Sequence, residues 1–129
     1  MNDADLPHQV IGACLNVHGR LGPGLTRDAY EECLAIELRE LELEARRGEP
    51  LSFDYRGHRV TAAGRLDFIV NDTLLLQVKA QELVSDLDKQ QFESQLRLSG
   101  LRSGLLVNFN VTTLRKGIHR VMLKRKEPS

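Results

Sequence analysis

Residues 64–80 constrain this chain more than any other stretch. They read as two strands joined by a tight turn, because the turn-forming pair Asn71-Asp72 lies between two apolar runs. Gln77 and Lys79 are two residues apart on the second strand, so their side chains leave the same face of the sheet. A polar pair on one face of an otherwise apolar strand predicts a functional site there.

Asp67 lies in the first of these strands, beside that polar pair. An aspartate, an oxygen ligand on the next strand and a lysine two residues further on can hold a hard divalent cation and orient a water molecule beside it. Asp67, Gln77 and Lys79 therefore predict a metal and water site of the kind used in nuclease chemistry.

These residues resemble the PD-(D/E)xK nuclease superfamily, with Asp67 as its aspartate, Gln77 at its second carboxylate and Lys79 as its lysine. The chain is also similar to small bacterial proteins named for a GxxExxY motif, in residues 17–25, 29–34, 98–101 and 105–110. The similarity runs from about residue 11 to about residue 120. It implies one nuclease-like domain over residues 1–129, with a core at about 6–124. The implied fold is α/β (α+β-like): a restriction-endonuclease-like core with a mixed central β-sheet flanked by helices.

The motif that names the GxxExxY family departs from its pattern here. It reads Gly24-Leu-Thr-Arg27-Asp-Ala-Tyr30, so Arg27 stands where the family has glutamate. In the resembled superfamily that glutamate points at the metal site, and Glu31, one turn further along the same helix face, is the candidate replacement. The alternative is that Glu31 is an exposed surface carboxylate. Gln91 matches a glutamine that recurs in the family and is expected near the site.

The resemblance thus implies the catalytic residues Asp67, Gln77, Lys79 and Gln91 and the metal ligands Asp67, Gln77 and Glu31. Gln77 supplies no charge to a cation, and an inward Arg27 would repel one. At a separation of 4 Å and an effective dielectric constant of about 20, exchanging attraction for repulsion costs several kcal/mol. We therefore expect a degenerate metal site in a non-catalytic module that binds nucleic acid or a protein partner and needs no cofactor.

The alternative is an active Mg²⁺- or Mn²⁺-dependent phosphodiesterase. A transposon-end endonuclease of the superfamily uses a glutamine-x-lysine motif, so Gln77 does not exclude catalysis. Lys79 also has a structural interpretation, because a buried Asp67–Lys79 ion pair can persist after chemistry is lost.

The formal net charge is zero, so bulk charge does not predict strong binding to nucleic acid. The distribution is uneven, because residues 95–126 contain no Asp or Glu. The candidate nucleic-acid contacts in this segment are Arg97, Arg102, Arg115 and Lys116. The basic run 124–126 can equally be a solubilising tail.

The sequence has no apolar run near the roughly 20 residues that cross a bilayer, and no signal-peptide pattern. We expect a bacterial-type cytoplasmic protein without a membrane partner; a homodimer through the strand meander or the helix pair stays open. Cys14 and Cys33 are expected to be reduced, buried thiols, with a disulfide between packed helices as the alternative.

The periodicity predicts three helices. The first covers residues 6–21, and the second runs from an N-cap at Thr26 to about residue 41. The third begins with a capping box at Ser85 and ends at about residue 99. Residues 51–55 and 58–70 are expected to form an antiparallel meander with the strand ending at Lys79. Strands are also expected at 105–109 and, at the sheet edge, at 117–123. Leu87, Phe92 and Leu96 give the third helix its apolar face, and His18 is expected to make a structural hydrogen bond.

Overall fold

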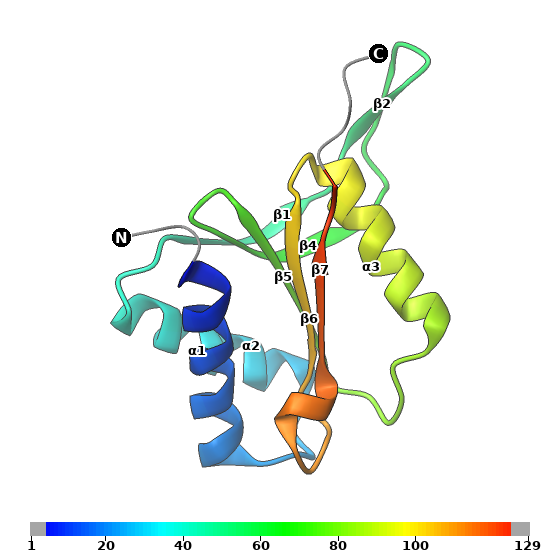
Figure 1. The fold of residues 1–129 in the computed structure, drawn as a ribbon. Helices are drawn as coiled ribbons and strands as arrows, with labels where there is room; N and C mark the ends of the chain where they lie inside the picture. Colours follow the sequence, from blue (N-terminus) through cyan, green and yellow to red (C-terminus); the bar gives the residue numbers. More distant parts are fainter. Residues whose placement is uncertain (1–4, 125–129) are drawn as a thin grey trace.

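The computed structural model describes residues 5–124, which contain three α-helices, seven strands and a short 3₁₀-helix (Figure 1). The helices are α1 (Leu6–Leu21), α2 (Arg27–Glu40), α3 (Asp86–Ser99) and the 3₁₀-helix η2 (Leu114–Gly117). The strands are β1 (Ala45–Pro50), β2 (Phe53–Tyr55), β3 (His58–Val60), β4 (Arg65–Val70), β5 (Leu74–Lys79), β6 (Ser103–Asn108) and β7 (Ile118–Met122). All three predicted helices are confirmed, and the mixed α/β class is the one that the sequence predicts.

Capping residues set the ends of α2 and α3. The Thr26 hydroxyl accepts a hydrogen bond of 3.2 Å from the Ala29 N–H, which begins α2. Ser85 and Asp88 exchange both bonds of a capping box at the start of α3. Gly100 ends α3 in the left-handed conformation, at φ 82°. These local signals are the reason that the helix boundaries can be predicted closely.

Five strands form one mixed sheet in the order β1-β4-β5-β6-β7. β5 and β6 are parallel, in a register that places Lys79 opposite Asn108 and Leu74 opposite Ser103. The other neighbouring pairs are antiparallel. A parallel pair needs a crossover connection, and α3 supplies it. β7 lies at an edge of the sheet, as the sequence predicts.

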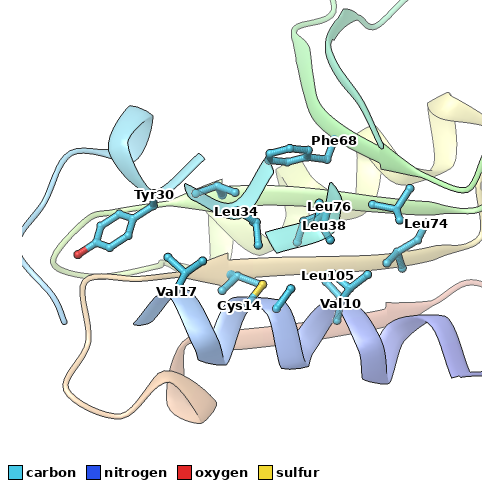
Figure 2. Packing of buried hydrophobic residues seen from close by; sticks show 14 of the residues in the cluster. Val10, Cys14, Val17, Tyr30, Leu34, Leu38, Phe68, Leu74, Leu76 and Leu105 are labelled. Carbon is cyan, nitrogen blue, oxygen red and sulfur yellow. The ribbon is translucent and has the colours of Figure 1, made fainter. Parts of the chain in front are cut away.

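Helices cover both faces of this sheet: α1 and α2 lie on one face and α3 on the other (Figure 1). Alternate residues of β5 serve the two layers, because Leu74 and Leu76 pack in the cluster under α1 and α2, whereas Leu75 packs with the residues of α3. Figure 2 shows the first cluster, in which α1 side chains Val10 and Cys14 face the sheet. A polar side chain on the inner strands therefore needs a partner within one of two dry layers.

Helix α3 packs very close to strand β6. A Cβ atom on Gly104 of β6 would lie 2.7 Å from Phe92 Cζ, so only glycine lets the helix approach this far. Phe92 and Leu96 are buried against the sheet, as predicted. The prediction for Leu87 is wrong: its side chain is 73% exposed. Leu87 precedes Phe92 by five residues, which at 3.6 residues per turn places it about 140° around the helix from the face of Phe92.

The predicted meander is only partly correct: the antiparallel pairings of β2 with β3 and of β4 with β5 are present, but the strand expected to connect them is interrupted. Residues 58–70 do not form one strand but two, β3 and β4, separated by an irregular segment before Gly64. β2 and β3 pair only with each other, in a hairpin that projects beyond the main sheet (Figure 1). Strand β4 instead pairs with β1, also in antiparallel orientation. The sequence of β1 has no alternation of apolar residues that would predict a strand.

The loop between α1 and α2 is anchored by the last residue of the Gly24–Tyr30 motif. The buried Tyr30 hydroxyl donates to the Gly22 carbonyl at 2.5 Å and accepts from the Leu25 N–H at 3.2 Å. Its ring stacks on Phe109 with centroids 4.7 Å apart. His18 Nε2 lies 2.7 Å from the Val111 carbonyl, which confirms the structural hydrogen bond expected of it.

Cys14 and Cys33 are both free, so the disulfide alternative is not realised. Cys14 is fully buried, and burial raises the pKa of its thiol to about 12. Cys33 is only half-buried, contrary to the expectation. In the described part of the chain, the helices are too short or too polar to cross a membrane.

Candidate functional site

The predicted site residues meet where β4 begins and β5 ends. The backbone ladder between these strands reaches only from Val70 to Phe68 on β4, so Asp67 lies just beyond its last pair. Gln77 and Lys79 both line a cavity of about 180 Å³ that Asp67 also lines. The structure therefore brings together the three residues that the sequence pattern singles out, on one side of the sheet.

The Gln77 side chain takes the place of a ladder bond. Its Oε1 accepts from the Asp67 backbone N–H at 2.6 Å, and its Nε2 donates to the Arg65 carbonyl at 3.1 Å. The same Nε2 lies 3.1 Å from Gln95 Oε1 on α3. Gln77 is only 5% exposed, and both ends of its buried amide have hydrogen-bond partners, as buried polar groups usually do. Its side-chain oxygen is therefore already engaged by the backbone of β4.

The carboxylate of Asp67 is enclosed by donors. Its Oδ2 accepts from the Val78 N–H at 2.8 Å. Its Oδ1 accepts from both Arg27 Nη1 and Arg65 Nη1, each at 2.9 Å. Arg27 therefore turns inward and reaches the aspartate directly, in the position where the sequence predicts that it would repel a metal ion.

Glu31 is not a solvated surface carboxylate. It is 1% exposed and faces three arginines, so that alternative is wrong. Arg65 Nη2 lies 2.7 Å from its Oε1, Arg27 Nη1 lies 3.0 Å from its Oε2, and Arg47 Nη2 lies 3.5 Å from its Oε1. Glu31 and Asp67 thus share Arg27 and Arg65. Three guanidiniums surround two buried carboxylates, and we call these five residues the arginine network.

The two carboxyl groups of the network respond differently to their surroundings. Burial acts to raise the pKa of Glu31, but the hydrogen bond from Arg65 and the charges of the three arginines outweigh burial and lower it. Burial raises the pKa of Asp67, and the negative charge of Glu31 adds to the rise. The Val78 N–H and the two guanidiniums oppose that shift without cancelling it. Glu31 is therefore the more firmly ionised member of the pair.

Lys79 does not pair with Asp67. Its side chain is partly exposed, and within residues 5–124 it makes no hydrogen bond or ion pair. Asp88, across the cavity on α3, has a lowered pKa, mainly through its capping bonds with Ser85 and to a lesser degree through the charge of Lys79. The interpretation of Lys79 as half of a structural Asp67–Lys79 pair is wrong, because arginines hold that aspartate.

Gln91 lies on the rim of the same cavity, and it is exposed. Its position on α3 is one turn from Gln95, which touches Gln77. The expectation that Gln91 lies near the site agrees with this placement; its chemical role stays a prediction.

The four predicted nucleic-acid contacts do not form one surface. Arg97 lies in the last turn of α3 and Arg102 just before β6, at the end of the sheet where Ser103 faces Leu74. Arg115 and Lys116 lie in η2, at the opposite end, beyond Asn108. Of the basic run at residues 124–126, residues 125 and 126 fall outside the described part of the chain.

Two residues of the site, Arg47 and Arg65, are not predicted from the sequence. Arg65 could have been predicted, because it lies two residues before Asp67 on the same strand and its side chain therefore leaves the same face. Arg47 reaches the site from β1, whose pairing with β4 is not visible in its composition.

These residues do not fit a divalent metal ion. Among residues 5–124, no cluster of three or more His, Cys, Asp or Glu side chains could hold one. The oxygens of Asp67 and Gln77 already accept hydrogen bonds, and the two acids face guanidiniums. A metal needs ligands free of such cations. The predicted ligands Asp67, Gln77 and Glu31 lie close together. Arginine side chains neutralise the two carboxylates, and the Gln77 oxygen already accepts a backbone hydrogen bond.

A family model described as the PD-(D/E)XK nuclease superfamily matches residues 4–121. Comparisons with curated proteins and with solved structures give no significant match. The five-stranded mixed sheet flanked by helices is consistent with the restriction-endonuclease-like fold that the sequence predicts. The narrower resemblance to the GxxExxY family stays a prediction.

Proposed function

Because the chain belongs to the PD-(D/E)XK nuclease superfamily, we propose that it is a non-catalytic member that binds nucleic acid. The observation that carries this proposal is the contact of 2.9 Å between Arg27 Nη1 and Asp67 Oδ1. A guanidinium in that position occupies an oxygen that a metal would need and repels the metal itself. The arginine network then takes the place of a metal centre.

The electrostatic penalty on a metal is large. Two unit charges 4 Å apart interact by about 4 kcal/mol at an effective dielectric constant of about 20, and a divalent ion doubles that figure. Each 1.4 kcal/mol is a factor of about ten in affinity. Two inward arginines therefore lower the affinity for Mg²⁺ or Mn²⁺ by orders of magnitude, and the chemistry that such an ion supplies is lost with it.

Nucleic acid is the partner that this site favours. Arg27, Arg65 and Lys79 line the cavity together with Asp67 and Asp88, so the charged groups of its lining carry a net charge of +1. Phosphates are the anions for which guanidinium and ammonium groups are suited. The segments similar to the GxxExxY family support a bacterial, cytoplasmic member of that narrower family.

Calorimetry with Mn²⁺ tests the loss of the metal site. We expect no saturable binding to the natural protein, and binding to the variants Arg27→Glu and Arg27→Glu/Gln77→Glu, which replace a repelling cation by ligands. Arg39→Glu is the matched control: it changes the charge equally on the same helix, about 18 Å along its axis at 1.5 Å per residue. It should gain no binding.

Nucleic-acid binding and cleavage are measured on the same preparations with a panel of DNA and RNA. We expect binding that weakens with salt, and no cleavage with Mg²⁺ or Mn²⁺. Mn²⁺-dependent cleavage by the natural protein that disappears in Asp67→Ala and in Lys79→Ala would establish the active nuclease instead. A protein that binds none of the nucleic acids would also overturn the proposal.

A further inference from the structure

We propose that the cavity between β5 and α3 holds one phosphate group directly, without a metal ion, on Arg27, Lys79 and Gln91. This inference rests on the proposed function, since the phosphate is taken to be part of a nucleic acid. The buried carboxylates of Glu31 and Asp67 act as positioning residues. Their ion pairs hold Arg27 and Arg65 in place, and the remaining donors of Arg27 are free to bind the phosphate.

Arg27 retains donors that the fold does not use. A guanidinium has five N–H donors. Glu31 and Asp67 both engage Arg27 through Nη1 alone. Its Nη2 lies 3.6 Å from Asp28 Oδ1, a distance at which the two groups attract each other without a hydrogen bond. The side chain is 39% exposed, so Nε and Nη2 are available to an incoming oxygen.

Lys79 and Gln91 add unused donors on the opposite walls of the cavity. Lys79 ends β5 and Gln91 lies on α3, and neither side chain makes a hydrogen bond within the described residues. The Lys79 ammonium makes no ion pair within the described residues, although its charge acts on Asp88 across the cavity. Beside two arginines, it would gain charge-assisted bonds from a bound anion. The three donors come from three different elements and line one space.

The size of the cavity limits what can enter it. Its volume of about 180 Å³ lies below the roughly 300–1,000 Å³ of pockets that hold drug-sized ligands. A phosphate group fits this space better than a whole nucleotide. The base and sugar attached to it would remain outside, so the cavity can secure a strand without reading its sequence.

The guanidiniums thus perform here what a metal performs in an active nuclease, which is to attract phosphate oxygens. In the proposed metal-free site no ion would activate a water molecule, so the guanidiniums would attract the phosphate without supplying a nucleophile. Binding should then be independent of divalent ions. This feature separates the inference from a site in which a metal bridges the protein and the phosphate.

The test is fluorescence polarisation with labelled single-stranded DNA in EDTA. Lys79→Gln is the main variant, because no described hydrogen bond or ion pair of the fold depends on the Lys79 side chain; Arg27→Gln is the second. Each should weaken binding about 10- to 100-fold, as expected for a lost hydrogen bond between charged groups. Asp28→Asn should instead tighten binding, because it removes a competing anion from Arg27. Arg39→Gln, which removes a charge from the far end of α2, should bind as the natural protein does.

Three competitors identify the source of the phosphate. A linear 5′-phosphorylated strand that competes better than its dephosphorylated form indicates a terminal phosphate. A circular strand that competes equally well indicates an internal phosphodiester. Inorganic phosphate should also compete, and the addition of Mg²⁺ should not strengthen binding.

The failures of the two proposals are distinguishable. If the natural protein binds DNA and Lys79→Gln and Arg27→Gln bind equally well, the phosphate cavity is refuted and the nucleic-acid function stands. Binding that requires Mg²⁺ also refutes the metal-free cavity. If the natural protein binds no nucleic acid, the proposed function falls and this inference falls with it.

Discussion

The side-chain oxygen of Gln77 accepts a 2.6 Å hydrogen bond from the backbone N–H of Asp67. This bond continues the pairing of β4 with β5 past the last pair of their ladder. The amide nitrogen of Gln77 completes the arrangement by donating to the Arg65 carbonyl. A glutamine can do both, whereas a glutamate has no donor to offer. Gln77, which the sequence predicts to stand at the superfamily's second carboxylate, therefore forms two backbone hydrogen bonds that an ionised glutamate could not both form.

Gln77→Glu should destabilise the protein at neutral pH. The variant leaves the Arg65 carbonyl without its donor and places a second carboxylate beside Asp67, at a side-chain position that is only 5% exposed. A polar group left unpaired in such a place costs about 1–3 kcal/mol. Urea unfolding at pH 7 measures the difference. Gln90→Glu makes the same chemical change on an exposed position of α3 and should stay within about 0.5 kcal/mol of the natural protein. Equal stability of both variants would show that the amide bridge is unimportant.

Glu31→Gln should lower stability at pH 7, by about 1–3 kcal/mol, because it removes the charge that holds three arginines. The value lies well below that for a fully buried ion pair, since each arginine side chain is about two-fifths exposed and can be hydrated instead. Urea unfolding gives this difference. Glu32→Gln, on the exposed neighbour, is the control.

The same variant should change how stability depends on pH. The pKa of Glu31 in the folded protein lies below its ordinary value of 4.5. Its stabilising contribution is therefore complete above about pH 4.5 and is lost as the pH falls through the lowered folded pKa. The gap between the natural protein and Glu31→Gln should close in that acidic window. A gap of constant size from pH 7 down to pH 3 would contradict the role assigned to the Glu31 charge.

Sequence reasoning predicts the parts of this fold that depend on local chemistry. The helix boundaries follow from Thr26, Ser85 and Gly100, whose capping roles involve only nearby backbone groups. The co-location of Asp67, Gln77 and Lys79 follows from the two-residue period of a strand and one turn. Each of these inferences needs no knowledge of distant contacts.

The parts that could not be predicted depend on pairing between distant segments. β1 is extended because β4 lies beside it, since its sequence Ala-Arg-Arg-Gly-Glu-Pro has little strand propensity of its own. That pairing carries Arg47 to Glu31. The burial of Glu31 is stable only when arginines from two strands neutralise it, so its place could not be read from α2 alone.

Gly104→Ala should destabilise the protein by about 1–3 kcal/mol, as overpacking of a filled core does. The added methyl group would meet the ring of Phe92 at 2.7 Å and force α3 away from the sheet. Gly12→Ala is the matched control: on α1 its Cβ meets nothing within 4 Å, so it should stabilise the helix by about 0.5–1 kcal/mol. Thermal and urea unfolding measure the change in stability of each variant, which should be a loss for Gly104→Ala and a gain for Gly12→Ala. A neutral Gly104→Ala would mean that α3 is free to shift.

Tyr30→Phe should loosen the loop between α1 and α2 without disturbing the aromatic stack. The variant keeps the ring that packs on Phe109 but removes the hydroxyl that joins the Gly22 carbonyl to the Leu25 N–H. Losing both partners of a buried hydroxyl should cost about 1–3 kcal/mol in urea unfolding. Hydrogen exchange offers a more specific measurement, because the Leu25 amide should exchange faster while amides in β5 keep their protection. Tyr55→Phe, on a side chain that is 61% exposed, should change neither quantity. Unchanged exchange at Leu25 in Tyr30→Phe would show that the Tyr30 hydroxyl does not hold this loop.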